Sequence, residues 1–427
     1  MRFIPSKLAE DGIIPRFADI YDHMGIHKMT FENESGELLS ALLELPIDRS
    51  PHSFAVFAHC FTCTKNLSAV RYISSALASA GFGVLSFDFT GLGESEGEFA
   101  DENFSTSVSD LISAAEFLKQ NYQSPSIVIG HSLGGAAALL AGSRLDSVKA
   151  VITIGSPSSP THVRQLLQED MSTLIEAGQA EVSIGGRPFL IKRQFVEDLE
   201  KHNLLETVRK SRKAYLFFHS PQDRIVGIEN SAELYKAAFH PKSFISLDGA
   251  DHLLSDKKDA RYVGDTIASW ASRYIEIPSE KEIKTSNDVA AQLGSDEKFT
   301  TLIKAGRHRL TADEPESFGG NDFGPSPYGL VASGLASCTA MTLRLYADRK
   351  QWDLREITVH ISHEKTHIED CLNCESRDGK IDQFTRELEV VGELDEDQKQ
   401  RLVEIADKCP VHKTLEGNVV IKTLLRN

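Results

Sequence analysis

Two different periodicities of hydrophobic residues divide the chain. Up to residue 277, short runs of consecutive apolar residues alternate with longer amphipathic segments. Consecutive apolar runs are typical of strands that are buried on both faces, and with helices between them they predict a parallel sheet covered on both sides. The runs that predict strands are 54–60, 82–93, 126–132, 150–157, 214–221 and 243–251, and the clearest amphipathic segments are 67–81 and 104–121.

Two segments interrupt this alternation. Residues 29–45 predict a pair of strands around a Ser35-Gly36 turn, ahead of the parallel sheet. Residues 158–212 are polar and partly helical, with a hairpin predicted at 181–191. We interpret 158–212 as a cap inserted over the sheet. An ordinary crossover connection is the alternative, but the segment is long for one.

The hydrophobic pattern changes after residue 277. Strands predicted at 356–364 and 384–394 alternate apolar and polar residues, whereas a long apolar helix is predicted at about 327–349 and an amphipathic one at about 395–408. This mixture is typical of an α+β domain. The predicted organisation is an extension at 1–25, an α/β domain at 26–277, a linker at 278–284 and an α+β domain at 285–427.

Composition narrows the classes of function. The chain is 41% hydrophobic and 25% charged, with a net charge of −16, which argues against nucleic acid or an anionic membrane as the main partner. No window approaches the roughly 20 uninterrupted apolar residues of a membrane span. The first residues contain no apolar signal region, so we expect a cytoplasmic protein whose six cysteines are reduced.

A serine lies at the turn between a predicted strand and a predicted helix. The strand at 126–132 runs into Gly130-His131-Ser132-Leu133-Gly134, and an alanine-rich helix follows. In this context G-x-S-x-G indicates a nucleophilic serine on a strained turn, because the small residues let strand and helix approach closely. The helix N-terminus would face developing negative charge. A glycine-rich turn without chemistry is the alternative.

A nucleophilic serine needs a base and a group that orients the base. Asp223 and His252 each follow a predicted strand, in the loops that leave the strand C-termini. The chain order serine, acid, histidine is the one expected for this architecture. Asp251 is the weaker acid because it adjoins His252 and its side chain would point elsewhere. We therefore predict a triad of Ser132, His252 and Asp223. The alternatives are that Asp223 only forms an Asx turn and that His252 is a solvated loop histidine.

These motifs resemble the α/β-hydrolase family over about residues 25–275, which implies a serine esterase. The segment His59-Cys60-Phe61 resembles the family's His-Gly-x turn, with cysteine in place of glycine. The resemblance implies that the backbone N–H groups of Phe61 and Leu133 hold the oxyanion, with His59 in support.

The pair Cys60 and Cys63 leaves two other interpretations open. A zinc site needs two more ligands, which no nearby Cys/His pair in this domain supplies. A thioredoxin-like redox pair needs to begin a helix, which the following residues favour only weakly. We favour the oxyanion turn.

The C-terminal domain carries a second set of motifs. Segments 324–350 and 405–417 resemble the OsmC/organic hydroperoxide reductase family, with Cys338 in the long helix and Cys409 before a proline as signature elements. The resemblance implies a thiol peroxidase in which Cys338 attacks the peroxide, Cys409 resolves the sulfenic acid as a disulfide, and a dithiol reduces it. It also implies an intertwined homodimer, which the all-round apolar helix fits.

Cys338 lies among alanine, serine and threonine, where packing without chemistry is the alternative. It is too deep in its helix to feel the N-terminal dipole strongly, so its thiol needs a cationic partner. Arg307 matches the family spacing better than Arg309. The hydroperoxide-resistance branch of the family has a glutamate where this chain has Tyr328, so another acid would have to hold the arginine.

A third cluster contains His360, His363, His367, Cys371 and Cys374. Its C-x-x-C and preceding histidines suit zinc, but His360 and His363 point to opposite faces of a strand. We favour a polar loop and no metal site.

We therefore expect a cytoplasmic esterase for short- to medium-chain carboxylic esters, fused to a peroxidase for organic hydroperoxides that depends on a dithiol reductant. No cofactor is expected. Two alternatives remain open: the OsmC-like domain is only a dimerisation scaffold, or the hydrolase domain is a ligand-binding module.

Overall fold

The structure is a computed structural model and describes residues 25–60, 62–167, 171–184, 187–277, 282–295, 297–367 and 380–426. The chain divides into two compact units, Met1–Lys281 and Glu282–Asn427. The predicted extension 1–25 lies outside the described residues apart from Gly25, and so does much of the predicted linker.

Unit 1 is built on one eight-stranded sheet with the order β1-β2-β4-β3-β5-β6-β9-β10. The first two strands form the predicted hairpin, which is confirmed, and the neighbours from β4 to β10 pair in parallel. The strands are β1 (Ile26–Glu32), β2 (Leu38–Glu44), β3 (Ser53–Ala58), β4 (Phe82–Phe87), β5 (Ile127–His131), β6 (Ala150–Ile154), β9 (Ala214–His219) and β10 (Lys242–Ser246).

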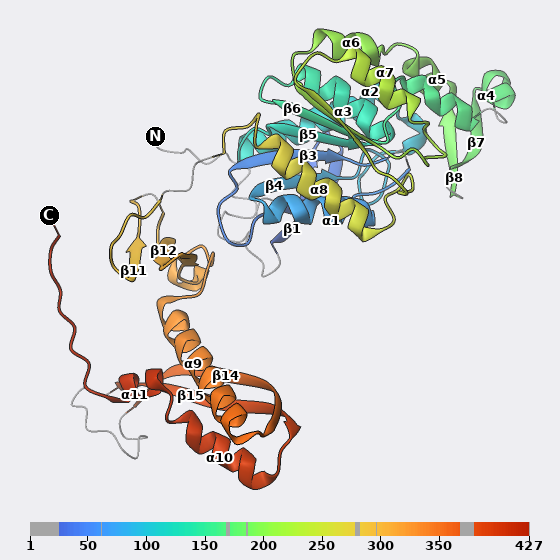
Figure 1. Cartoon of the computed structure of the whole chain (residues 1–427). Coiled ribbons are helices and arrows are strands. Elements are labelled where there is room, and N and C mark those ends of the chain that lie inside the picture. The colour runs from blue at the N-terminus through green and yellow to red at the C-terminus, as the bar shows by residue number, and fades with distance from the viewer. Residues whose placement is uncertain are drawn as a thin grey trace. The chain divides into compact units, whose positions relative to one another are not determined.

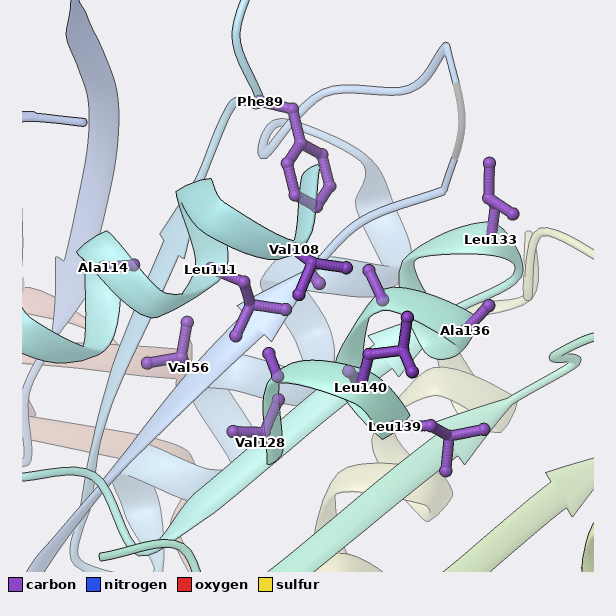
Figure 2. Packing of buried hydrophobic residues seen from close by; sticks show 14 of the residues in the cluster. Val56, Phe89, Val108, Leu111, Ala114, Val128, Leu133, Ala136, Leu139 and Leu140 are labelled. Carbon is purple, nitrogen blue, oxygen red and sulfur yellow. The ribbon is translucent and has the colours of Figure 1, made fainter. Parts of the chain in front are cut away.

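Helices cover both faces of this sheet, as the consecutive apolar strands predicted (Figure 1). One core lies under α1 (Ser68–Ser79) and α8 (Lys257–Ala271). The other lies under α2 (Phe104–Asn121) and α3 (Leu133–Arg144), where Val108 and Leu111 pack near Leu140 (Figure 2). The helix α7 (Glu229–Ala237) follows β9.

The segment between β6 and β9 contains the elements interpreted as a cap, and its predicted hairpin is confirmed by the pairing of β7 with β8. Its elements are η4 (Pro160–Leu167), α4 (Met171–Ala177), β7 (Gln179–Ile184), β8 (Arg187–Lys192), α5 (Arg193–Leu199) and α6 (Leu204–Lys210). The short helix η3 (Phe99–Asp101), before α2, contacts this segment through Gln194, whose side-chain amide donates to the Asp101 carbonyl at 2.7 Å.

Unit 2 has the α+β composition that its alternating strands predicted. Its strands are β11 (Val289–Gln292), β12 (Thr301–Ala305), β13 (His308–Ala312), β14 (Asp353–His367) and β15 (Lys380–Glu393), in a three-stranded and a two-stranded antiparallel sheet. Its helices are η5 (Glu316–Phe318), α9 (Pro327–Lys350), α10 (Glu396–Ala406) and α11 (Pro410–Glu416).

The long helix α9 begins where the sequence marks a start. The Ser326 side chain caps it by accepting from the Gly329 N–H, and Pro327 occupies the first turn. By length and composition alone α9 could cross a membrane, but a long helix within a compact domain passes the same test. It packs against β14, α10 and α11, while Met341 and Leu345 remain 66% and 70% exposed in the single chain.

Candidate active site

Ser132 occupies a strained turn between β5 and α3. Its φ of 54° and ψ of −125° are rare for a residue with a side chain. A Cβ on Gly130 would lie 2.3 Å from the Gly134 carbonyl oxygen, and one on Gly134 would lie 2.2 Å from the His59 carbonyl oxygen. Only glycine therefore fits at both positions, and the close packing holds the serine in its unfavourable conformation.

The structure brings Ser132, His252 and Asp223 into one hydrogen-bonded chain. The Ser132 Oγ lies 2.9 Å from His252 Nε2, and His252 Nδ1 lies 2.7 Å from Asp223 Oδ2. An ionised carboxylate only accepts, so Nδ1 carries the ring proton and Nε2 is left to accept from the serine. This is the geometry needed to remove the serine proton during attack.

Backbone groups hold the Asp223 carboxylate in place. Its Oδ1 accepts from the N–H groups of Ile225 at 2.8 Å and Val226 at 3.0 Å. Burial opposes ionisation of Asp223, but the hydrogen bond from His252 and these N–H groups outweigh it and lower the pKa below its ordinary value. Asp251 instead accepts from the Ser255 N–H at 2.8 Å, whereas His252 Nδ1 bonds to Asp223.

Two buried histidines near the triad were missed in the sequence. His131 Nε2 donates to the His252 carbonyl at 2.7 Å, and burial with the nearby His252 lowers the pKa of His131 to about 3, so this ring stays neutral. His219 Nε2 donates to the Val226 carbonyl at 2.8 Å and lies 3.6 Å from Asp223 Oδ2. His131 is the last residue of β5 and His219 the last residue of β9, and these positions at strand C-termini were the available signal.

The predicted oxyanion donors are described only in part. Leu133 begins α3 directly after the nucleophile, whereas Phe61 lies outside the described residues. The carbonyls of Ala58 and His59 lie against Gly134, so the end of β3 is packed onto the serine turn. This is the position in which the loop after β3 can present an N–H group to an oxyanion.

Cys60 and Cys63 form a disulfide, so the expectation that they are reduced is wrong for this structure. Two bonded sulfur atoms are not thiolate ligands for zinc. The helix α1 begins only at Ser68, so neither cysteine begins a helix in the way that a thioredoxin-like pair would.

A buried carboxylate joins this loop to the one after β4. Asp88 accepts from the Lys65 N–H at 2.7 Å, from Lys65 Nζ at 2.5 Å and from the Glu94 N–H at 3.0 Å. His59 is also buried, with Nδ1 2.8 Å from the Cys60 carbonyl and Nε2 3.8 Å from Asp88. Burial lowers the pKa of His59, so His59 supports the loop as a neutral ring.

In unit 2 the structure brings Cys338 of α9 and Cys409, the residue before α11, into hydrogen-bonding contact. Burial and the Cys409 thiol raise the pKa of Cys338. Burial opposes ionisation of Cys409 too, but the hydrogen bond from Cys338 and the N–H of His412 outweigh it and lower its pKa, with help from the Thr339 hydroxyl. The negative charge is therefore held better on Cys409 than on Cys338.

An arginine that the sequence analysis missed, Arg386, binds Thr339, the residue after Cys338. Its guanidinium donates to the Thr339 hydroxyl at 3.2 Å, to the Ala406 carbonyl at 3.1 Å and to Asp407 at 2.5 Å. Arg307, the predicted partner, is exposed between β12 and β13, and among the described residues it has no hydrogen bond or ion pair. No sequence motif indicated Arg386, which lies opposite Ile361 in the pairing of β14 with β15.

The third cluster is not brought together as a metal site in the part of the chain that the structure describes. His363 stacks between Tyr328 and Phe384 and lies 2.9 Å from Asp382 Oδ1, while His360 lies 3.7 Å from Glu389. Cys371 and Cys374 lie outside the described residues. Within the described ranges no group of three or more His, Cys, Asp or Glu residues is arranged to hold a metal ion.

Comparisons with known proteins match each of the two units to a protein family. The family model of serine aminopeptidase, S33 matches residues 56–209, and the model of OsmC-like protein matches residues 319–424. A search among curated proteins finds no match.

Among solved structures, the esterase domain of a Rhodothermus marinus protein is 52% identical, with a TM-score of 0.51, and the match covers 59% of this chain and all of that domain. Est1E from Butyrivibrio proteoclasticus, solved with ferulic acid, is 20% identical with a TM-score of 0.50, and the match covers 58% of this chain and 99% of that one. Mouse alpha/beta hydrolase domain-containing protein 10 is 21% identical with a TM-score of 0.50, over the same 58% and 99%. The last two show the fold alone.

Unit 1 is thus an esterase domain of the α/β-hydrolase fold, and the C-terminal unit is OsmC-like. The chain belongs to the family of α/β-hydrolase–OsmC fusions.

Proposed function

We propose that unit 1 hydrolyses carboxylic esters with short to medium acyl chains through Ser132, His252 and Asp223. The observation that carries the proposal is the continuous hydrogen-bonded chain, 2.9 Å from serine to imidazole and 2.7 Å from imidazole to carboxylate. The 52% identity to an esterase domain supports ester hydrolysis as the reaction class.

The geometry sets out the steps. Ser132 Oγ attacks the ester carbonyl carbon while His252 Nε2 takes its proton, and Asp223 stabilises the imidazolium that forms. The N–H groups of Leu133 and Phe61 bind the oxygen that becomes negative. The imidazolium then protonates the leaving alcohol, and water activated by His252 releases the acid from the acyl-enzyme.

Two matched aspartate variants test the assignment. Asp223→Asn keeps the shape but stabilises the wrong ring tautomer, so kcat on a p-nitrophenyl ester should fall by about 10⁴. Asp251→Asn, one residue from the histidine, should change kcat less than about threefold because Asp251 bonds only to Ser255. Ser132→Ala should abolish the burst of p-nitrophenol. A full burst from Ser132→Ala would refute the triad, whereas no burst from wild type would favour a ligand-binding role for the domain.

For unit 2 we propose thiol-dependent reduction of organic hydroperoxides, supported by the contact of Cys338 with Cys409. The Cys338 thiol first passes its proton to Cys409. The Cys338 thiolate then attacks the peroxide, giving a sulfenic acid and an alkoxide that takes the proton from Cys409 and leaves as the alcohol. The Cys409 thiolate next attacks the sulfenic sulfur and displaces hydroxide, which takes a proton from solvent and leaves as water, and the resulting disulfide is reduced by an external dithiol.

Peroxide consumption with a dithiol separates turnover from a purely structural role. Wild type should consume cumene hydroperoxide catalytically, Cys338→Ser should not, and Cys409→Ser should trap a sulfenic acid that dimedone labels. Wild-type consumption no faster than that of Cys338→Ser would leave the OsmC-like unit as a dimerisation scaffold.

A further inference from the structure

A small cavity lies beside the nucleophile turn. It has a volume of about 30 Å³, enough for one or two water-sized groups. Leu133 and Ala137 of α3 form one wall, and Phe99 of η3 and Phe195 of α5 form another. Because Leu133 and Gly134 directly follow Ser132, the cavity adjoins the turn that carries the nucleophile.

The cavity is held in shape by the segment over the sheet. Gln194 binds the Asp101 carbonyl at 2.7 Å, and the rings of Phe99 and Phe189 lie 5.1 Å apart in an edge-to-face arrangement. Figure 2 shows Phe89 and Leu133, both of which line the cavity, at the edge of the core between α2 and α3. The walls are therefore mostly apolar and fixed by packing.

One polar group facing this cavity lacks a partner. Glu102 bonds through its carboxyl to the Thr106 side chain, but its Oε2 is buried and has no hydrogen-bond partner among the described residues. An unsatisfied buried acceptor costs about 1–3 kcal/mol, which a bound donor would recover.

The second carboxylate of the cavity is already satisfied. Asp110 accepts from the Thr90 N–H at 2.9 Å, from the Thr90 hydroxyl at 2.9 Å and from Asn33 at 3.2 Å. Burial, with the nearby carboxylates of Asp110, Glu37 and Asp101, raises the pKa of Glu102 to about 7. Near neutral pH the Glu102 carboxyl can therefore both accept and donate, which suits a hydroxyl group.

We propose that this cavity is the specificity pocket of the esterase and that it takes a hydroxyl-bearing part of the substrate, which donates to Glu102 Oε2. The inference rests on the proposed ester hydrolysis at Ser132. The volume limits the recognised part to a hydroxyl with one adjacent carbon. Glu102 is thus the residue that distinguishes hydroxylated esters from plain alkyl esters of the same length.

Three esters test the pocket: ethyl butyrate, ethyl 3-hydroxybutyrate and 2-hydroxyethyl butyrate, followed by acid release at constant pH. Ethyl butyrate has no hydroxyl, ethyl 3-hydroxybutyrate has one on the acyl side, and 2-hydroxyethyl butyrate has one on the alcohol side. Wild type should prefer one hydroxylated ester over ethyl butyrate by about tenfold or more in kcat/KM, since a buried acceptor left unpaired penalises the analogue without the hydroxyl. The preferred ester identifies the side that enters the cavity.

Glu102→Leu should lose this preference, and its kcat/KM on ethyl butyrate should rise because no unpaired acceptor penalises that ester any longer. Glu102→Gln, which still offers an amide oxygen, should keep most of the preference. Glu98→Leu, an exposed glutamate before η3, is the matched control and should behave as wild type. The melting temperature of Glu102→Leu checks that the variant folds. At pH values above 7 it should be higher than that of wild type, because a buried charge is removed.

Equal kcat/KM for all three esters in wild type, or a preference that survives Glu102→Leu, overturns the inference while leaving the esterase in place. Hydrolysis of none of the esters overturns the proposed function, and the inference with it.

Discussion

Gly155, at the end of β6, shows how little space surrounds the triad. Its φ is +56°, and a Cβ there would lie 3.3 Å from Asp223 Oδ2 and 3.4 Å from His252 Nδ1. The backbone therefore passes directly beside the hydrogen bond that fixes the imidazole. At the scale of residues, we therefore expect the rate of the proposed reaction to depend on this glycine as well as on the three side chains.

We expect Gly155→Ala to lower kcat by about tenfold or more, because displacing a catalytic group by a fraction of an ångström is costly. It should also destabilise the protein by about 1–2 kcal/mol through left-handed strain. Kinetics on a p-nitrophenyl ester and thermal unfolding measure the two effects.

Gly36→Ala is the control, since Gly36 has a φ of +84° and open space around the Cβ position. It should lose similar stability and no activity. An unchanged kcat in Gly155→Ala would mean that the His252–Asp223 pair tolerates the extra atom.

The candidate triad residues could be predicted from the sequence because serine, acid and histidine occur in a known order along the chain in this architecture. Ser132, Asp223 and His252 were chosen from their places after strands, and the structure brings them together. His219 was not found although it ends a strand, and Arg386 was not found because its partners include a helix end that no local pattern indicates.

At the scale of elements, the loops after β3 and β4 are joined through one buried ion pair. The side chains of Lys65 and Asp88 are 1% and 0% exposed, and Asp88 also binds the Glu94 N–H. Both loops border the serine turn, so their mutual position affects the oxyanion side of the site.

We expect Lys65→Met to cost about 3–5 kcal/mol in unfolding free energy, because it leaves the Asp88 carboxylate buried without its cation. Denaturant unfolding measures this. Lys119→Met breaks an exposed pair with Glu116 and should cost less than about 1 kcal/mol. Equal losses in the two variants would mean that water reaches Asp88.

A second carboxylate makes stability depend on pH. Glu44, the last residue of β2, has its pKa raised from 4.5 to about 7 by burial, which Ser75 and Arg71 offset only in part. Between these values the folded protein keeps a proton that the unfolded chain has lost, so stability falls as pH rises through this window.

We therefore expect Glu44→Gln to gain stability relative to wild type between pH 5 and pH 8, by about 1–2 kcal/mol after allowance for partial exposure. Denaturant unfolding at the two pH values gives the difference. A variant that tracks wild type at both would show that the carboxyl ionises freely in the folded state.

The ends of helices could be predicted where a capping side chain marks them. The helix predicted at 104–121 is observed as α2 at Phe104–Asn121, since the Asn103 side chain caps it by accepting from Thr106. The helix predicted at about 395–408 ends earlier, at Ala406, where the chain turns toward Cys409. Pairing across the three-stranded sheet of unit 2 had no comparable local signal, because β11 to β13 are short.

At the scale of the whole molecule, the two units differ in how completely they bury apolar residues. Unit 1 has extensive cores on both faces of its sheet, whereas the core of unit 2 contains few residues. The last described residues of unit 2 include exposed apolar side chains, and Leu425 is 93% exposed. A single copy of unit 2 therefore leaves much apolar surface in water.

We expect the chain to form a homodimer through unit 2. Ile421→Asp should weaken it by about tenfold or more, because a charge would be buried in the interface. Analytical ultracentrifugation measures the change. Ile47→Asp places the same charge on an exposed isoleucine of unit 1 and should leave the dimer intact. A monomeric wild type would rule out this assembly.

The Cys60–Cys63 disulfide has a practical consequence for handling the protein. The dithiol that would return the Cys338–Cys409 pair to its thiol form is also the reagent that opens disulfides elsewhere. Peroxide turnover and ester turnover measured in one reducing buffer would therefore refer to a chain whose bridge beside the serine has been cut. Assays of the two proposed activities therefore need separate redox conditions, because a change of reductant would act on both units at once.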